Sequence, residues 1–266
     1  MSAAKARRRG SAAPFAAVPR QSVPVHETVK RELVFLVADS GMEAMIGTFL
    51  GRNDFYRKLG CAPFDFNAKT DIIKAGGHDP GLVKREAGQI LNLRRKEFRR
   101  AMVVVDNAYA GSPGPDVIRA RIAAQLEGIW DQFAVVVIDP ELENWFWVDS
   151  PDLLKRALVW TRKDDDRTPK AVLEEAGLWQ AGADKPTDPK RAVEYLYKQG
   201  HTRDATNGIF KRLAAGLPSV RRCTDESFRQ LTATLCEWFP SQAPTAAYGT
   251  DHAGENEQTE RREHTQ

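Results

Sequence analysis

The stretch from Phe133 to Asp149, Phe-Ala-Val-Val-Val-Ile-Asp-Pro-Glu-Leu-Glu-Asn-Trp-Phe-Trp-Val-Asp, decides the fold. Its first six residues form an apolar, β-branched run, which is typical of a strand buried on both faces. Pro140 cannot donate to a strand ladder and therefore ends that strand. Three carboxylates surround the proline, at Asp139, Glu141 and Glu143. Open α/β sheets bind their ligands at the carboxyl ends of the strands. Acids at this position therefore predict a functional site.

A second interpretation of the same stretch stays open. Acidic residues that follow a strand often cap the next helix or lie on a solvated turn. Trp145 and Trp147 are equally consistent with packing in the core or beneath a lid. The stretch alone does not decide between a chemical site and a structural turn.

Two further runs repeat the strand–acid pattern. Residues 32–38 form a buried-strand run that ends at Asp39, and a helix beginning near residue 40 carries Glu43 in its first turn. Residues 101–106 form another run, which ends at Asp106. Alternating strands and helices predict a mostly parallel sheet flanked by helices, with right-handed crossovers. For Asp39 and Glu43, the capping interpretation is the commoner one for acids at a helix start.

Composition excludes several classes of protein. The chain has 266 residues, of which 42% are hydrophobic and 28% are charged, with a net charge of +3. These values are ordinary for a globular protein and say little about partners. The three cysteines form no Cys-x-x-Cys pair, which excludes a zinc knuckle and favours a reducing, cytoplasmic setting. We expect no membrane association, because no apolar run is long enough to span a bilayer and no secretory signal is visible.

Four regions are expected along the chain. Residues 1–27 form a basic, disordered tail and residues 241–266 a polar, disordered one, because neither can bury enough apolar surface. Residues 28–150 form the α/β domain, and residues 151–240 form an all-helical region packed on it. A basic helix over residues 82–100 is a candidate nucleic-acid face, although a solvated helix surface is the default explanation.

The convergence of the acids predicts a metal site. In a parallel sheet the carboxyl ends of the strands share one edge, and carboxylates gathered there repel one another unless a cation is present. Oxygen ligands favour Mg²⁺ or Mn²⁺. The predicted metal ligands are Asp39, Asp106, Asp139, Glu141 and Glu143, and the predicted catalytic residues are Asp39, Glu43, Asp106 and Glu143. His78 and Asp79 lie in a further turn, where they could position a phosphate or a metal, although a lone His-Asp pair in a turn is more often a surface turn.

These motifs resemble a Toprim-related family of uncharacterised bacterial proteins. The similarity lies in the strand–acid–helix start at residues 34–43, the strand ending at Asp106, and the Glu-x-Trp element after the last strand. It continues in Lys185-Pro186 and in the stretch Arg221-Arg222-Cys223-Thr-Asp-Glu-Ser227-Phe228-Arg229. The turn at residues 77–81 resembles one branch, whose members belong to anti-phage systems that include a methylation-associated defence system.

The resemblance implies a Toprim-like α/β fold and a Mg²⁺-dependent nuclease that acts on nucleic acid, with DNA as the expected substrate, within a defence complex. Toprim enzymes use a glutamate after the first strand and an Asp-x-Asp pair after a later one. Here Asp39 stands at the first position, and Asp106-Asn107-Ala108 lacks the second aspartate. The alternative is therefore a catalytically inactive Toprim-like adaptor that binds nucleic acid or partner subunits.

Overall fold

A parallel sheet forms the centre of the molecule. The computed structural model describes residues 29–161, 167–204, 206–220 and 223–241. In these ranges the strands pair in the order β2-β1-β3-β4, and every pairing is parallel. The strands are β1 (Arg31–Val37), β2 (Ile72–Lys74), β3 (Phe98–Asp106) and β4 (Phe133–Ile138). The predicted parallel α/β sheet is confirmed, whereas both predicted tails, apart from Ser241, lie outside the described residues.

Helices connect and follow the strands. The first group comprises α1 (Ser40–Leu50), α2 (Phe55–Leu59), α3 (Ala68–Asp71), α4 (His78–Gly81), the π-helix η1 (Leu82–Glu86), α5 (Ala87–Arg94) and α6 (Pro115–Leu126). The second group follows β4 and comprises α7 (Glu143–Phe146), α8 (Pro151–Leu158), α9 (Pro169–Glu175), α10 (Pro189–Lys198), α11 (Gly208–Gly216) and α12 (Glu226–Trp238).

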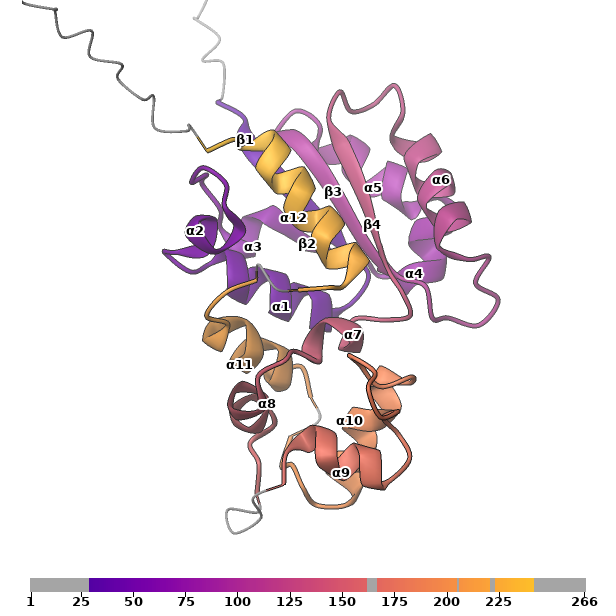
Figure 1. The fold of residues 1–266 in the computed structure, drawn as a ribbon. Helices are drawn as coiled ribbons and strands as arrows, with labels where there is room; N and C mark the ends of the chain where they lie inside the picture. Colours follow the sequence, from indigo (N-terminus) through magenta and orange to yellow (C-terminus); the bar gives the residue numbers. More distant parts are fainter. Residues whose placement is uncertain (1–28, 162–166, 205, 221–222, 242–266) are drawn as a thin grey trace, which may run out of the picture.

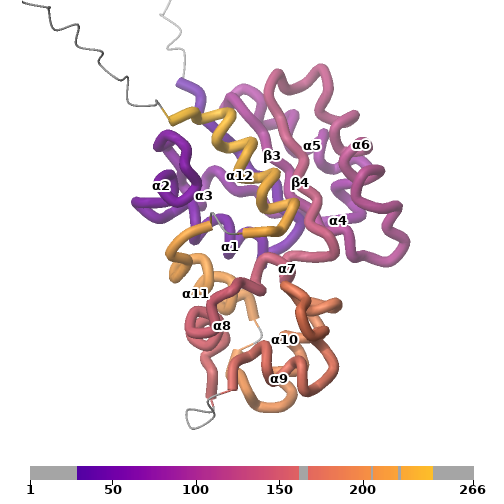
Figure 2. Tube along the Cα trace, in the orientation of Figure 1, coloured from indigo at the N-terminus to yellow at the C-terminus, as the bar shows by residue number. Residues whose placement is uncertain are grey.

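The helices cover the sheet on both faces and at one edge. Helix α12 crosses the front of β3 and β4 in Figure 1, while α5 and α6 flank the sheet from the other side. Helices α7 to α10 lie beyond the carboxyl ends of the strands, as the chain trace in Figure 2 also shows. The last helix therefore returns to the sheet, and the segment between β4 and α12 covers the carboxyl ends of the strands.

The predicted basic helix over residues 82–100 is shorter than expected. It ends at Arg94, and β3 begins at Phe98, which is buried. Arg100 then pairs with Glu32 of β1 across 2.8 Å. Three residues that look like a continuing basic helix therefore belong to a strand, because Phe98 and Ala101 fill the core while Arg99 is exposed.

The register of the sheet determines which acids can meet. Val37 of β1 pairs with Val104 of β3, so continuing the ladder by two residues sets Asp39 beside Asp106. Asp106 itself pairs with Ile138 of β4. Because side chains alternate between the faces of a sheet, Asp139, one residue further, points to the opposite face from Asp106.

Two contacts hold the helices that follow β4 against the rest of the molecule. An ideal Cβ on Gly41 of α1 would lie 2.9 Å from Leu142 Cδ2, so the glycine lets the segment before α7 approach α1. Arg52 Nη1 donates to the carbonyl oxygens of Ala214, Ala215 and Leu217, which satisfies the end of α11. Within the described ranges, no helix has the length and apolarity needed to cross a membrane.

Candidate functional site

Asp106 is the centre of the candidate site. It ends β3 and is only 9% exposed, yet its Oδ1 atom has no hydrogen-bond partner among the described residues. Burial raises the pKa of this carboxyl well above its usual value, and four neighbouring carboxylates raise it further: Asp79, Asp39, Glu143 and Glu141. A buried acid that is left unpaired among other acids costs stability, which is the arrangement expected at a functional site.

Asp39 combines the two roles considered from the sequence. Its Oδ1 accepts the backbone N–H of Met42 at 2.8 Å, so it is the N-cap of α1. Its second carboxylate oxygen makes no protein hydrogen bond within the described part of the chain, and the Asp39 carboxylate is close enough to Asp106 to raise the pKa of that acid. Glu43 lies in the first turn of the same helix but is exposed, and it is not among the carboxylates that raise the pKa of Asp106 most.

Asp79 joins the site although its turn looks like an ordinary surface loop in the sequence. Its Oδ1 accepts the backbone N–H of Asp106 at 2.7 Å, which fixes it beside the end of β3. Burial raises the pKa of Asp79, and the nearby Asp39 carboxylate acts in the same direction. The preceding residue, His78, has a φ of 52°, a left-handed conformation that few non-glycine residues adopt. Such backbone geometry is enriched at functional sites.

Glu141 and Glu143 approach Asp106 from the β4 side. Burial and the adjacent Glu141 carboxylate raise the pKa of Glu143 to about 7. Glu141 Oε1 accepts the backbone N–H of Lys190 at 3.2 Å, and its Oε2 lies 3.9 Å from Lys190 Nζ. Desolvation would lower the pKa of Lys190, but Glu143 and Glu141 together raise it, so the ammonium stays charged.

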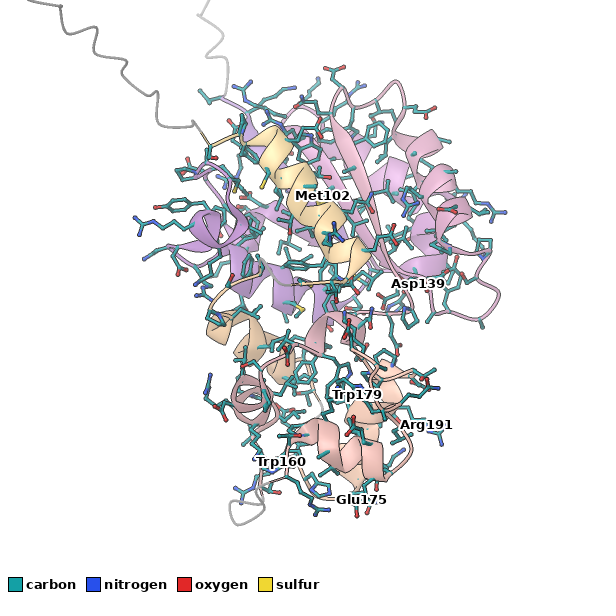
Figure 3. The ribbon with its side chains drawn as sticks, in the orientation of Figure 1. Met102, Asp139, Trp160, Glu175, Trp179 and Arg191 are labelled. Carbon is teal, nitrogen blue, oxygen red and sulfur yellow. The ribbon has the colours of Figure 1, made fainter. Side chains whose placement is uncertain are left out.

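Asp139 lies apart from this group, because the register of β3 and β4 turns its side chain to the opposite face of the sheet from Asp106. Its side chain accepts a hydrogen bond from Asn107 Nδ2 at 2.9 Å. With Val137, two residues before it, Asp139 lines a different cavity of about 500 Å³ between the first turns of α6 and α12. Figure 3 shows Asp139 at the end of β4. Of the predicted metal ligands, the structure therefore brings together Asp39, Asp106, Glu141 and Glu143 and sets Asp139 apart; Glu43, predicted as a catalytic residue, also lies outside the group.

The tryptophans after β4 are structural. Trp145 is 5% exposed, and its Nε1 donates to Asp225 and Ser227 at the start of α12. Trp147 is 3% exposed, and its Nε1 donates to the carbonyl oxygen of Pro189 at 3.1 Å. The first contact ties α7 to α12 and the second ties it to α10. The packing interpretation of these residues is therefore correct.

Residues that carry the resemblance in the sequence form one hydrogen-bonded network. Lys185 Nζ lies 3.0 Å from Asp225 Oδ2 and donates to the carbonyl oxygen of Asn144 at 2.7 Å. Asn144 Nδ2 also donates to Asp225. Burial would raise the pKa of Asp225, but the hydrogen bond from Ser227 and the charge of Lys185 lower it instead. This network sets the position of α7, which carries Glu143. Arg221 and Arg222 lie outside the described residues.

The carboxylate oxygens around Asp106 are of the ligand type that Mg²⁺ prefers. In the described part of the chain, no three His, Cys, Asp or Glu side chains converge tightly enough to hold a metal ion on their own. Mg²⁺ is commonly held by one or two carboxylates, with water and substrate phosphates completing its shell. The unpartnered Oδ1 of Asp106 and the free oxygens of Asp39 and Asp79 are suitable ligands of this kind.

Comparison with known proteins found no matching protein family, no matching curated protein and no matching solved structure.

Proposed function

We propose that this protein is a metal-dependent, Toprim-like phosphodiesterase that cleaves nucleic acid, with DNA as the expected substrate, and that it works in an anti-phage defence complex. The observation that carries the chemistry is the buried Asp106 carboxylate, unpartnered at Oδ1 and surrounded by Asp39, Asp79, Glu141 and Glu143. The defence setting is supported by the resemblance of the strand-end motifs and of the Glu-x-Trp element.

Each residue of the site has a role that follows from its surroundings. Asp106, with Asp39 or Asp79, would hold Mg²⁺ or Mn²⁺. When bound there, the cation supplies a Lewis acid for a phosphodiester oxygen. Glu143 has a pKa of about 7, so near neutral pH it exchanges a proton readily and can act as a general base toward water. Asp79 orients Asp106 by accepting its backbone N–H.

One observation favours the alternative of a non-catalytic adaptor. Ala108 stands where the second aspartate of Asp-x-Asp is expected, and it is exposed. Asn107, between the two positions, bonds to Asp139 and to Ser112 and so serves the loop. Under this alternative, Asp39 is a helix cap, Glu141 holds the start of α10, and the protein binds nucleic acid or partner subunits without cleaving them.

Cleavage assays separate the two functions. Single- and double-stranded DNA and RNA are incubated with Mg²⁺ or Mn²⁺ and with the wild type, Asp106→Ala, Glu143→Ala or the control Glu127→Ala. Glu127 is an exposed carboxylate that follows α6, away from the strand ends. The proposal expects metal-dependent cleavage by the wild type and the control, with losses of about a hundredfold or more in the two site variants. Cleavage without added metal, or equal cleavage by all four proteins, would contradict it.

A further inference from the structure

The carboxylates around Asp106 divide into two halves. On one side, Asp39 follows β1 and Asp79 lies in α4, the helix after β2, and each has a carboxylate oxygen that makes no hydrogen bond to another residue in the described ranges. On the other side, Glu141 and Glu143 come from the segment after β4. The carboxylate of Asp106 is nine-tenths buried and unpartnered at Oδ1, and the negative charges of both halves raise its pKa.

Among the described residues, only the second half pairs with a lysine. Lys190 lies in the first turn of α10, where its backbone N–H and its ammonium group both approach Glu141, at 3.2 and 3.9 Å. Trp147 Nε1 donates to the carbonyl oxygen of Pro189, and Pro189 and Ala192 of α10 are buried, so packing sets the place of this helix. The backbone of Lys190 is therefore positioned beside Glu141, while its side chain remains 59% exposed.

The two halves therefore differ in net charge. Two carboxylates held close together near a protein surface repel each other unless a cation lies nearby. Lys190 supplies a cation to the Glu141/Glu143 half, whereas in the described ranges no lysine or arginine pairs with Asp39 or Asp79, and the positive group that acts on Asp79 is the neighbouring His78. A divalent ion is attracted more strongly to the half without a resident lysine.

We propose that Lys190 is the built-in cation of the Glu141/Glu143 half, so that the site recruits one divalent ion to the Asp106 side and Lys190 takes the place of a second. This inference rests on the proposed function for the identity of the ion. Lys190 is a positioning residue here: it neutralises Glu141 and Glu143, and it limits how many metal ions the site accepts.

Calorimetric titration with Mn²⁺ tests this role without measuring activity. The proteins are the full-length wild type, Lys190→Ala, Lys190→Arg and the matched control Arg191→Ala. Arg191 is the next residue on α10, is exposed, and is labelled on the outer side of that helix in Figure 3. Its removal changes the net charge by the same amount as removal of Lys190. All four proteins are first compared by thermal melting to establish that they fold.

The proposal expects the wild type, Lys190→Arg and Arg191→Ala to bind one Mn²⁺ with similar affinity. Lys190→Ala should take up a second ion or bind Mn²⁺ about tenfold more tightly, because a unit charge near a divalent ion has been removed. If Lys190→Ala titrates like Arg191→Ala, or if none of the proteins binds Mn²⁺, the role of Lys190 is overturned. Stronger Mn²⁺ binding by Lys190→Ala, without nucleic-acid cleavage by any variant, would contradict the proposed function and leave this inference standing.

Discussion

Replacement of Asp106 by asparagine should make the metal-free protein more stable. Asp106 is 9% exposed, one of its oxygens has no partner among the described residues, and four carboxylates raise its pKa. A buried acceptor without a hydrogen-bond partner costs about 1–3 kcal/mol, and more when the group is charged. Asparagine has nearly the same shape and no charge, and its amide can donate to a neighbouring carboxylate. We expect a gain of about 2 kcal/mol, or about 4–8 °C in Tm for a domain of this size.

The sign of the pH dependence follows from the direction of the shift. Because the folded protein holds the Asp106 proton more tightly than the unfolded chain does, stability falls as pH rises from the unfolded pKa towards the folded one. The difference in Tm between Asp106→Asn and the wild type should therefore be small near pH 4 and should grow as the pH rises above that. Thermal melting in the presence of a chelator, at several pH values, measures this difference.

The matched control and the effect of metal complete this test. Asp131 is an exposed acid in the loop before β4, and Asp131→Asn should leave the free energy of unfolding within about half a kcal/mol of the wild-type value. Addition of Mn²⁺ should raise the Tm of the wild type and of Asp131→Asn, but not that of Asp106→Asn. A variant Asp106→Asn that is less stable than the wild type at pH 8, or that responds equally to Mn²⁺, would refute the reasoning.

Three other perturbations have definite expected outcomes. Mn²⁺ affinity measured by calorimetry should rise between about pH 6 and pH 8, because Glu143, with a pKa of about 7, becomes ionised over that range and adds a negative charge near the ion; a flat profile would exclude Glu143 from the site. Asp225→Ala should lower stability by about 3 kcal/mol in chemical denaturation, because it removes the buried carboxylate that pairs with the Lys185 ammonium and accepts from Trp145, whereas the exposed neighbour Glu226→Ala should have little effect; equal effects would contradict the network. Gly41→Ala should destabilise the protein despite the better helix propensity of alanine, because the new Cβ would meet Leu142 at 2.9 Å; a higher Tm would show that the contact is not tight.

Local sequence patterns predicted the strands well because each strand is an uninterrupted apolar run. The run at residues 133–138 became β4 with the same bounds. The start of β3 was misjudged because Phe98, Arg99 and Arg100 follow a basic helix and continue its charge pattern. Residues 98–100 are extended because they pair with the neighbouring strand β1, which also supplies Glu32 as a partner for Arg100. This pairing is not visible in the local sequence.

The membership of the site depended on information that one-dimensional patterns lack. Asp39, Asp106, Glu141 and Glu143 were found because strand ends in a parallel sheet share an edge. Asp139 was included for the same reason, but the pairing of Asp106 with Ile138 turns it to the other face. A shift of one residue reverses the direction of a side chain, and the register is set by pairing across the sheet.

The sequence did not predict Asp79 and Lys190 as residues of the site, because the residues around each of them are typical of a surface turn and of an amphipathic helix. Asp79 lies in a glycine- and proline-rich turn, and Lys190 lies in the first turn of an amphipathic helix. The weak signal for Asp79 was that its turn follows a strand, as the other site acids do. For Lys190 no local signal exists, because its position over Glu141 arises from the docking of α10 against Trp147.

The most direct test of the central claim is to locate a divalent cation in crystals of the protein soaked with Mn²⁺, using the anomalous scattering of manganese. The account predicts a peak beside the carboxylate of Asp106, on the side of Asp39 and Asp79, and the loss of that peak in Asp106→Asn crystals. A well-diffracting soaked crystal with no manganese at Asp106, or with the same peak in the variant, would contradict the claim that these acids are gathered to bind metal.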